Sequence, residues 1–264
     1  SAGSAVTTPE DPASRANRII RDGEARISRA WFRSLTRWMD RTRPQVLGSG
    51  QIQPQNVGQN AAFWGELMES EVVPESASLY RRIRNRVTQR DEPITDPDAA
   101  AFLNEVGNRL KHVPDETYAL IVREIERGIA DGESVPDMTA RVQAVLTATG
   151  TPYWKNRAVT VARTEALAAV NAAVYAGAIR DAEARGDPAP FKVWLATEDT
   201  RTRPTHTKAD GQRTLLTSPF VVGGAQLKFP GDPRGPAQEV IMCRCSLLPI
   251  VLGETLDWTD RQDP

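Results

Sequence analysis

The chain has 264 residues and a net charge of −1, with 40% hydrophobic and 25% charged residues. This length suits one large domain or two small ones, and its apolar runs are too short to cross a bilayer, so no membrane partner is expected. Two cysteines exclude a fold held together by several disulfides. The charge is uneven, because residues 1–90 carry 14 arginines against 9 acidic residues.

The N-terminal third predicts a helical arm after a flexible tail at residues 1–13. Apolar residues then recur at helical spacing until Pro44, which is expected to end the first long helix. The stretch 44–60 is rich in Gly, Gln and Pro and predicts an extended linker. Two further helices are expected after it, separated at Pro74. Residues 14–94 would therefore form an arm that docks on a partner and holds little core of its own.

The remainder predicts compact helices followed by a small sheet. Residues 95–186 contain several helix starts, with proline at the first helical position and acidic residues in the first turn. The helical period is lost after Pro190, and short apolar runs separated by Gly and Pro predict antiparallel strands over 190–252. We expect an α+β fold with a mainly helical N-terminal two thirds, one domain at 95–252, and a C-terminal tail at 253–264.

Four residues near the C-terminus have the chemistry of metal ligands. His206 and Asp210 are four positions apart and would share one face of a short helix. Cys243 and Cys245 would point the same way on a strand, so the four side chains could bind zinc. In the alternative interpretation, His206 forms a local hydrogen bond and the cysteines pack as small apolar groups, without a cofactor. A single residue between the cysteines is short for a zinc site and favours this alternative.

Charged residues of a loop and of the long helix before it predict a structural latch. Its members are Arg163, Glu165, Asp199, Arg201 and Arg203. Opposite charges on the helix and the loop would pair and fix the loop, which would then not be an active site. As the alternative, Glu165 would be a general acid or base close to His206.

A basic helix near residue 80 indicates contact with an anionic partner. The arginines concerned are Arg81, Arg82, Arg84 and Arg86. Such a helix can neutralise DNA phosphates without reading sequence, although few aromatic residues are present for base stacking. An acidic protein surface is an equally suitable partner, and a solvated helix face is the simplest interpretation.

The order of several motifs resembles that of the phage Mu F-like head-morphogenesis family of minor capsid proteins. These motifs are ARTE (162–165) followed by an Ala-rich helix with Asn171, W…DTRTRPTH…DGQ (194–212), PF (219–220), PGDP (230–233) and CRC (243–245). Family members usually have Asn before the Cys-x-Cys motif, where this chain has Met242, so we expect a looser turn there. The resemblance implies a low-copy structural protein inside a tailed phage head, at or near the portal vertex, and it transfers no catalytic residues.

We therefore expect a minor capsid protein that binds the portal ring and acts in head assembly, DNA packaging or ejection. The major capsid or scaffolding protein and the packaged DNA are further expected partners, with assembly in the host cytoplasm. One alternative is a metal-assisted hydrolase or nuclease that uses His206, Asp210 and Glu165; another is a DNA-binding packaging factor. The chain has only 2 His and no motif for a nucleophile or a phosphate-binding loop, which argues against the enzyme.

Overall fold

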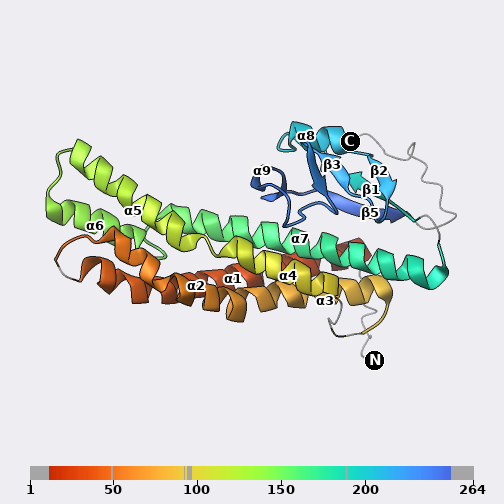
Figure 1. Ribbon diagram of the computed structural model, residues 1–264, viewed down its shortest axis with the longest axis horizontal. Helices are drawn as coiled ribbons and strands as arrows, with labels where there is room; N and C mark the ends of the chain where they lie inside the picture. The colour runs from red at the N-terminus through yellow and green to blue at the C-terminus, as the bar shows by residue number, and fades with distance from the viewer. Residues whose placement is uncertain (1–11, 49, 92, 94–96, 188–189, 251–264) are drawn as a thin grey trace, which may run out of the picture. The chain divides into compact units, whose positions relative to one another are not determined.

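The computed structural model describes residues 12–48, 50–91, 93, 97–187 and 190–250. Helices dominate the described residues up to Arg185, and the strands follow, all of them antiparallel to their neighbours (Figure 1). The predicted α+β fold, mainly helical and then a small antiparallel sheet, is confirmed. The predicted tails lie outside the described residues, except for Pro12 and Ala13, with which the first helix begins.

The chain divides into two compact units, each built from two stretches of sequence. Unit 1 comprises residues 1–79 and 107–166, and unit 2 comprises residues 80–106 and 167–264. These units cut across the predicted domains, whose independent folding stays a prediction. No helix among the described residues is long and apolar enough to cross a membrane.

Unit 1 is helical in its described residues. Its elements are α1 (Pro12–Leu47), the 3-10 helix η1 (Pro54–Asn60), α2 (Ala61–Leu67), the π-helix η2 (Met68–Val72), the start of α3 (Val73–Thr88), the end of α4 (Pro97–Leu110), α5 (Val113–Ala130), α6 (Val135–Val145) and the start of α7 (Pro152–Arg185). Figure 1 shows α5 and α6 as a helical hairpin in this series.

A cluster of tryptophans forms the core of unit 1. Trp31, Trp38, Trp64 and Trp154 are fully buried. The ring of Trp31 lies 6.1 Å from that of Trp64 and 6.4 Å from that of Trp154, and the rings of Trp38 and Trp64 are 5.9 Å apart. Large buried aromatic rings dominate core energetics. The N-terminal residues therefore contribute a substantial core, contrary to the expectation of an arm that holds little.

The stretch 44–60 is not an extended linker. Helix α1 passes Pro44 and ends at Leu47, and η1 follows within the same stretch. Val46 and Val57 are fully buried, so packing outweighs the cost of proline inside a helix, which is about 3 kcal/mol. The Gly-, Gln- and Pro-rich composition of this stretch gives no sign that its two valines are buried in the core.

The helix break expected at Pro74 is also absent. The π-helix η2 lies between α2 and α3 and leads directly into Val73 and Pro74. The backbone N–H of Val73 bonds to the carbonyl of Met68, five residues earlier. Proline lacks the N–H of one α-helical hydrogen bond, and its ring crowds the preceding turn. A π-helical turn just before Pro74 changes the hydrogen-bonding pattern there, and the chain remains helical through the proline.

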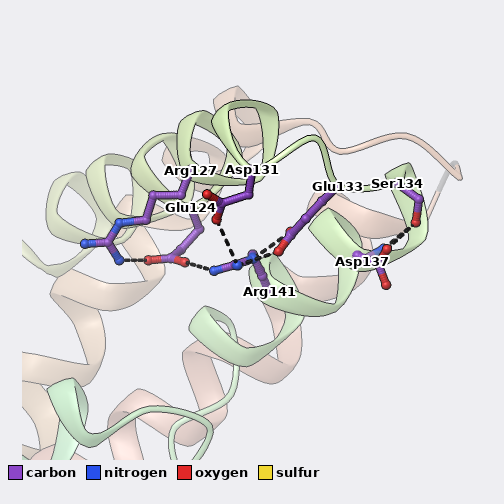
Figure 2. Close-up of polar contacts among 7 residues, drawn as sticks. All are labelled: Glu124, Arg127, Asp131, Glu133, Ser134, Asp137 and Arg141. Carbon is purple, nitrogen blue, oxygen red and sulfur yellow. Dashed lines mark hydrogen bonds and ion pairs between the residues drawn. The ribbon is translucent and has the colours of Figure 1, made fainter.

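Polar contacts close the α5–α6 hairpin of unit 1 (Figure 2). Arg141 donates from Nε and Nη2 to the two carboxylate oxygens of Glu133, at 2.7 and 2.5 Å, and from Nη1 to Glu124 at 3.3 Å. This hydrogen bonding holds the pKa of Glu133 below its usual value. Ser134 caps α6 by accepting from the backbone N–H of Asp137 at 3.4 Å. The helix start predicted from this Ser and Pro136 is therefore present.

Unit 2 contains two small sheets. In the first, β1 (Phe191–Leu195) lies between β2 (Arg213–Leu215) and β5 (Ser246–Ile250); in the second, β3 (Phe220–Val222) pairs with β4 (Ala225–Leu227). Two short helices, α8 (Pro204–Ala209) and α9 (Ala237–Val240), belong to the same unit. The strand positions follow the prediction, and the single expected sheet is divided into two.

Lys192 is a buried cation at the centre of the first sheet. Its side chain is fully buried, and its Nζ donates to the carbonyl of Lys228 at 2.6 Å. The rings of Tyr175 and Phe220 each lie 4.8 Å from Nζ. Burial lowers the pKa of Lys192 to about 8, although Asp232 acts to raise it.

Unit 2 is expected to gain stability as the pH rises from about 8 to about 10.5. Over that range the unfolded chain holds a proton on Lys192 that the folded chain has released, so raising the pH favours folding by up to about 3 kcal/mol. Urea titrations of the wild type and of Lys192→Met at several pH values measure the effect. In Lys192→Met, the free energy of unfolding should no longer rise with pH over this range. Equal slopes of the free energy of unfolding against pH in both proteins would contradict the prediction.

Candidate metal centre

Three of the four predicted metal ligands meet in the interior of unit 2. His206, Cys243 and Cys245 are each at most 4% exposed. Nδ1 of His206 lies 3.3 Å from Sγ of Cys245 and 3.8 Å from Sγ of Cys243. The three ligand atoms all lie within 4.8 Å of one another. Two sulfur atoms and one imidazole nitrogen are a donor set that suits zinc.

Local backbone structure brings these side chains together. His206 lies on α8, which Pro204 begins as a residue with a preset helical φ. Cys243 and Cys245 lie between α9 and β5, not on a strand as predicted. Met242, immediately before them, has a φ of 56°. This left-handed residue turns the chain just before the two thiols.

Glu239 fixes the other side of the imidazole ring. Its Oε2 lies 3.0 Å from Nε2 of His206 and also accepts from the hydroxyl of Thr205 at 2.9 Å. Glu239 is 6% exposed. Gly223, with a φ of 58°, makes room for it, because a Cβ there would lie 2.3 Å from Oε1 of Glu239. Sequence reasoning missed Glu239, since it stands in a short segment without a recognisable motif.

The two thiols share their protons unequally. A hydrogen bond from Cys243 lowers the pKa of Cys245, and the contact with His206 lowers it further. The same bond and burial raise the pKa of the Cys243 thiol.

Asp210 does not join this group among the described residues. Its Oδ1 accepts from the backbone N–H of Ala196 at 2.8 Å, at the end of β1. Asp210 follows the last residue of α8 and has an extended ψ of 135°. The helix has ended there, so the helical spacing that placed Asp210 on the face of His206 no longer applies.

Ion pairs and hydrogen bonds connect the loop after β1 (residues 196–203) to the segment that contains the two cysteines (residues 241–245). Asp199 accepts from both terminal nitrogens of Arg244, with Nη2 at 2.5 Å from Oδ1. This pairing holds the pKa of Asp199 well below its usual range. Arg201 approaches the same carboxylate at 3.5 Å, and Arg203 donates to the carbonyl of Ile241. Sequence reasoning missed Arg244, the residue between the two cysteines.

The helix side of the predicted latch has a different arrangement. Glu165 is 1% exposed and accepts two hydrogen bonds from Arg109, at 3.0 and 2.6 Å, within unit 1. Arg163 is exposed. The Glu165 carboxylate is therefore satisfied by an arginine 56 residues earlier in the chain, which no local pattern could indicate. The latch between helix and loop stays a prediction.

The arginines near residue 80 differ in exposure. Arg81 and Arg86 are exposed and Arg82 is intermediate. Arg84 is fully buried and donates to the carbonyl of Pro93 at 2.9 Å. Arg84 therefore has a structural position and does not offer its guanidinium to DNA or to a partner protein. Contact through the other arginines stays a prediction.

Asn171 connects α7 to the segments on both sides of the thiols. Its Nδ2 donates to the carbonyls of Pro230 and Cys245, and its Oδ1 accepts from the N–H of Leu247, each at 3.0 Å. The side chain is 2% exposed. Gly231, in the PGDP turn, has a φ of 78°, and a Cβ on it would meet Ala168 of α7 at 3.4 Å. The motif that follows ARTE thus has a concrete structural role.

The left-handed conformation of Met242 predicts a stabilising substitution. A residue with a Cβ costs about 1–2 kcal/mol in this conformation, and Gly and Asn tolerate it best. Met242→Gly and Met242→Asn should each raise the free energy of unfolding of unit 2 by about 0.5–1 kcal/mol. Urea titration measures this. Ile241→Gly, at a φ of −66°, is the control and should destabilise; stabilisation by both glycines would contradict the explanation.

Comparison with known proteins gives a family match over the segment that contains the candidate metal centre. Residues 119–248 match the family described as phage Mu protein F like protein. The NAD(+)–arginine ADP-ribosyltransferase EFV of Enterococcus faecalis is 28% identical over 148 residues, which are 56% of this chain and 29% of that protein. This chain therefore spans less than a third of that relative's length, and no solved structure matches. The resemblance to the phage Mu F-like family that the sequence motifs indicated is confirmed over residues 119–248.

Proposed function

We propose that this protein is a minor capsid protein that binds the portal ring inside the head of a tailed phage. The observation that carries the proposal is the family match over residues 119–248. The matched segment includes most of α5, all of α6 and α7, and in unit 2 the strands β1 to β4, the thiols and the start of β5. The protein would take part in head assembly, DNA packaging or ejection, and would join the particle in the host cytoplasm.

The exposed apolar residues of unit 1 support a protein partner. Large apolar side chains that remain at least 38% exposed there are Tyr118, Ile129, Val135, Tyr153 and Val159. Tyr118 and Ile129 are eleven positions apart on α5, close to three helical turns, so they share a face. Exposed apolar side chains that share a helix face are candidates for a protein contact, and we propose this face of α5 as the portal contact.

Co-purification with the portal protein of the same phage tests the proposal. The wild type should elute with the portal ring, and the double variant Tyr118→Glu/Ile129→Glu should not. Val221→Glu on β3, a residue that is 56% exposed in unit 2, is the matched control and should bind normally. Absence of wild-type protein from both portal complexes and purified virions would contradict the proposal.

We also propose a structural role without catalysis. The Enterococcus relative is named for arginine ADP-ribosylation, and the shared residues cover only a minor part of it. The purified full chain should neither consume NAD⁺ nor modify arginine, and it should cleave neither DNA nor peptides. Turnover in any of these assays that Glu165→Gln or His206→Ala abolishes, with the fold intact, would favour the enzyme.

A further inference from the structure

We propose that His206, Cys243 and Cys245 bind a zinc ion in unit 2, with Glu239 holding the imidazole ring from the opposite side. Portal binding does not depend on the proposal. The prediction from sequence had Asp210 as a ligand. The geometry instead gives three protein ligands, with the carboxylate of Glu239 contacting the second ring nitrogen of His206.

The distances between the ligand atoms fit tetrahedral zinc. Bonds of about 2.0–2.1 Å to nitrogen and about 2.3 Å to sulfur, at tetrahedral angles, separate a nitrogen from a sulfur ligand by about 3.6 Å. The distances from Nδ1 of His206 to the two sulfur atoms are 3.3 and 3.8 Å, on either side of this value. These two nitrogen–sulfur distances would need to change by only a few tenths of an ångström.

Glu239 sets the tautomer that a metal requires. An ionised carboxylate only accepts hydrogen bonds, so Nε2 of His206, at 3.0 Å from Oε2, carries the proton. In the neutral ring Nδ1 then presents its lone pair to the two sulfur atoms. A histidine ligand whose other nitrogen donates to a carboxylate is the usual outer arrangement of zinc sites. The hydroxyl of Thr205 and the space at Gly223 keep Glu239 in this position.

Charge and burial also favour an ion here. Zinc is bound by thiolates, and two thiolates with a neutral imidazole balance its charge of +2, so neither thiolate is left as an uncompensated buried charge. The strands of unit 2 are 3–5 residues long, so the unit has little regular sheet of its own. An ion would link α8 to the segment before β5, and metal binding contributes directly to the folding of small domains.

The fourth position is assigned to a water molecule. Among the described residues, the cluster contains three side chains that could bind a metal, and three protein ligands with one water is the composition of zinc sites that keep an open coordination position. X-ray absorption should accordingly show two sulfur atoms, one imidazole nitrogen and one further light atom. A spectrum without sulfur neighbours would overturn the assignment.

Metal analysis of the full chain is the first experiment. The protein, produced in zinc-supplemented medium and dialysed against a weak chelator, should retain about one zinc per chain. Titration of the apo protein with cobalt(II) should produce the intense near-ultraviolet absorption of a thiolate–cobalt bond. A wild type that retains no zinc and gives no such band overturns the proposal, without reference to any variant.

Variants separate the roles of the side chains. Cys245→Ser should lose both zinc and the cobalt band, while Glu239→Gln should keep the band and bind zinc about 10–100-fold more weakly. Asp210→Asn is the matched control, because it removes the carboxylate beside α8 that lies outside the cluster, and should bind like the wild type. Equal loss of metal in Asp210→Asn and Cys245→Ser would overturn the ligand set.

Discussion

Replacing Asn171 by Ala is expected to lower the free energy of unfolding of unit 2 by about 3–5 kcal/mol. The substitution removes three hydrogen bonds of 3.0 Å at once. It leaves two carbonyls, of Pro230 and Cys245, and the N–H of Leu247 without this partner. Each buried polar group that loses its partner costs about 1–3 kcal/mol. A small side chain cannot reach these groups from α7.

Hydrogen exchange followed along the chain measures this effect, because it reports each unit separately. Amides of β1 and β5 should lose protection in Asn171→Ala, whereas those of α1 and α2 should not. Asn171→Asp should be at least as damaging near neutral pH, since it keeps the acceptor for Leu247 but places a carboxylate against two carbonyl oxygens. Asn156→Ala, an exposed position on the same helix, is the control. If the backbone amides of β1 and β5 keep wild-type protection in Asn171→Ala, the prediction is wrong, and water replaces the hydrogen bonds of the Asn171 side chain.

These bonds concern a segment without regular secondary structure. Between α9 and β5, the side chain of Arg203 binds the carbonyl of Ile241, Thr197 binds that of Arg244 at 2.8 Å, and Asn171 binds that of Cys245. Backbone groups in a buried irregular segment need such partners, because they have none from a helix or sheet. The two thiols are therefore held in place from α7 and from the loop after β1, before any ion binds.

Much of the fold follows from local signals. Helical spacing of apolar residues and proline at helix starts predicted α5, α6 and α7, and loss of that spacing predicted the strands after Pro190. The failures lie where tertiary packing decides. Val46 and Val57 are buried within a stretch whose composition is typical of a linker, and Lys192 is fully buried although lysine side chains are mostly exposed. In both cases burial depends on contacts with residues distant in the sequence, which a local pattern does not show.

The candidate site shows the same division. His206, Cys243 and Cys245 could be chosen because His and Cys are common zinc ligands, and the structure brings the three side chains together. Glu239 could not be chosen, since one Glu among many has no distinguishing neighbour in the sequence. Asp210 was chosen by helical spacing, which fails where α8 ends. Prediction thus named three side chains that meet in the structure and missed Glu239, which contacts the imidazole ring.

The second large effect is expected at the buried ion pair between Glu165 and Arg109. Glu165→Ala should destabilise unit 1 by about 3–5 kcal/mol, because it strands the Arg109 guanidinium, whose side chain is 17% exposed. Arg109→Ala should cost a similar amount by stranding the carboxylate, which is 2% exposed. The double variant should cost clearly less than the sum of the two, since no charge is then left alone.

The location of the damage separates this pair from the predicted latch. If Glu165 acts through Arg109, hydrogen exchange in Glu165→Ala should increase at the end of α4 and the start of α7, while the loop 199–211 keeps its protection. Arg163→Ala is the matched control, because Arg163 lies two positions away on α7 and is exposed; it should change stability by at most about 0.5 kcal/mol. If Glu165→Ala releases the loop 199–211 and leaves the amides around Arg109 unchanged, the latch explains Glu165 better than the ion pair does. Additive costs in the double-mutant cycle would lead to the same conclusion, because they would show that the two charges do not stabilise each other.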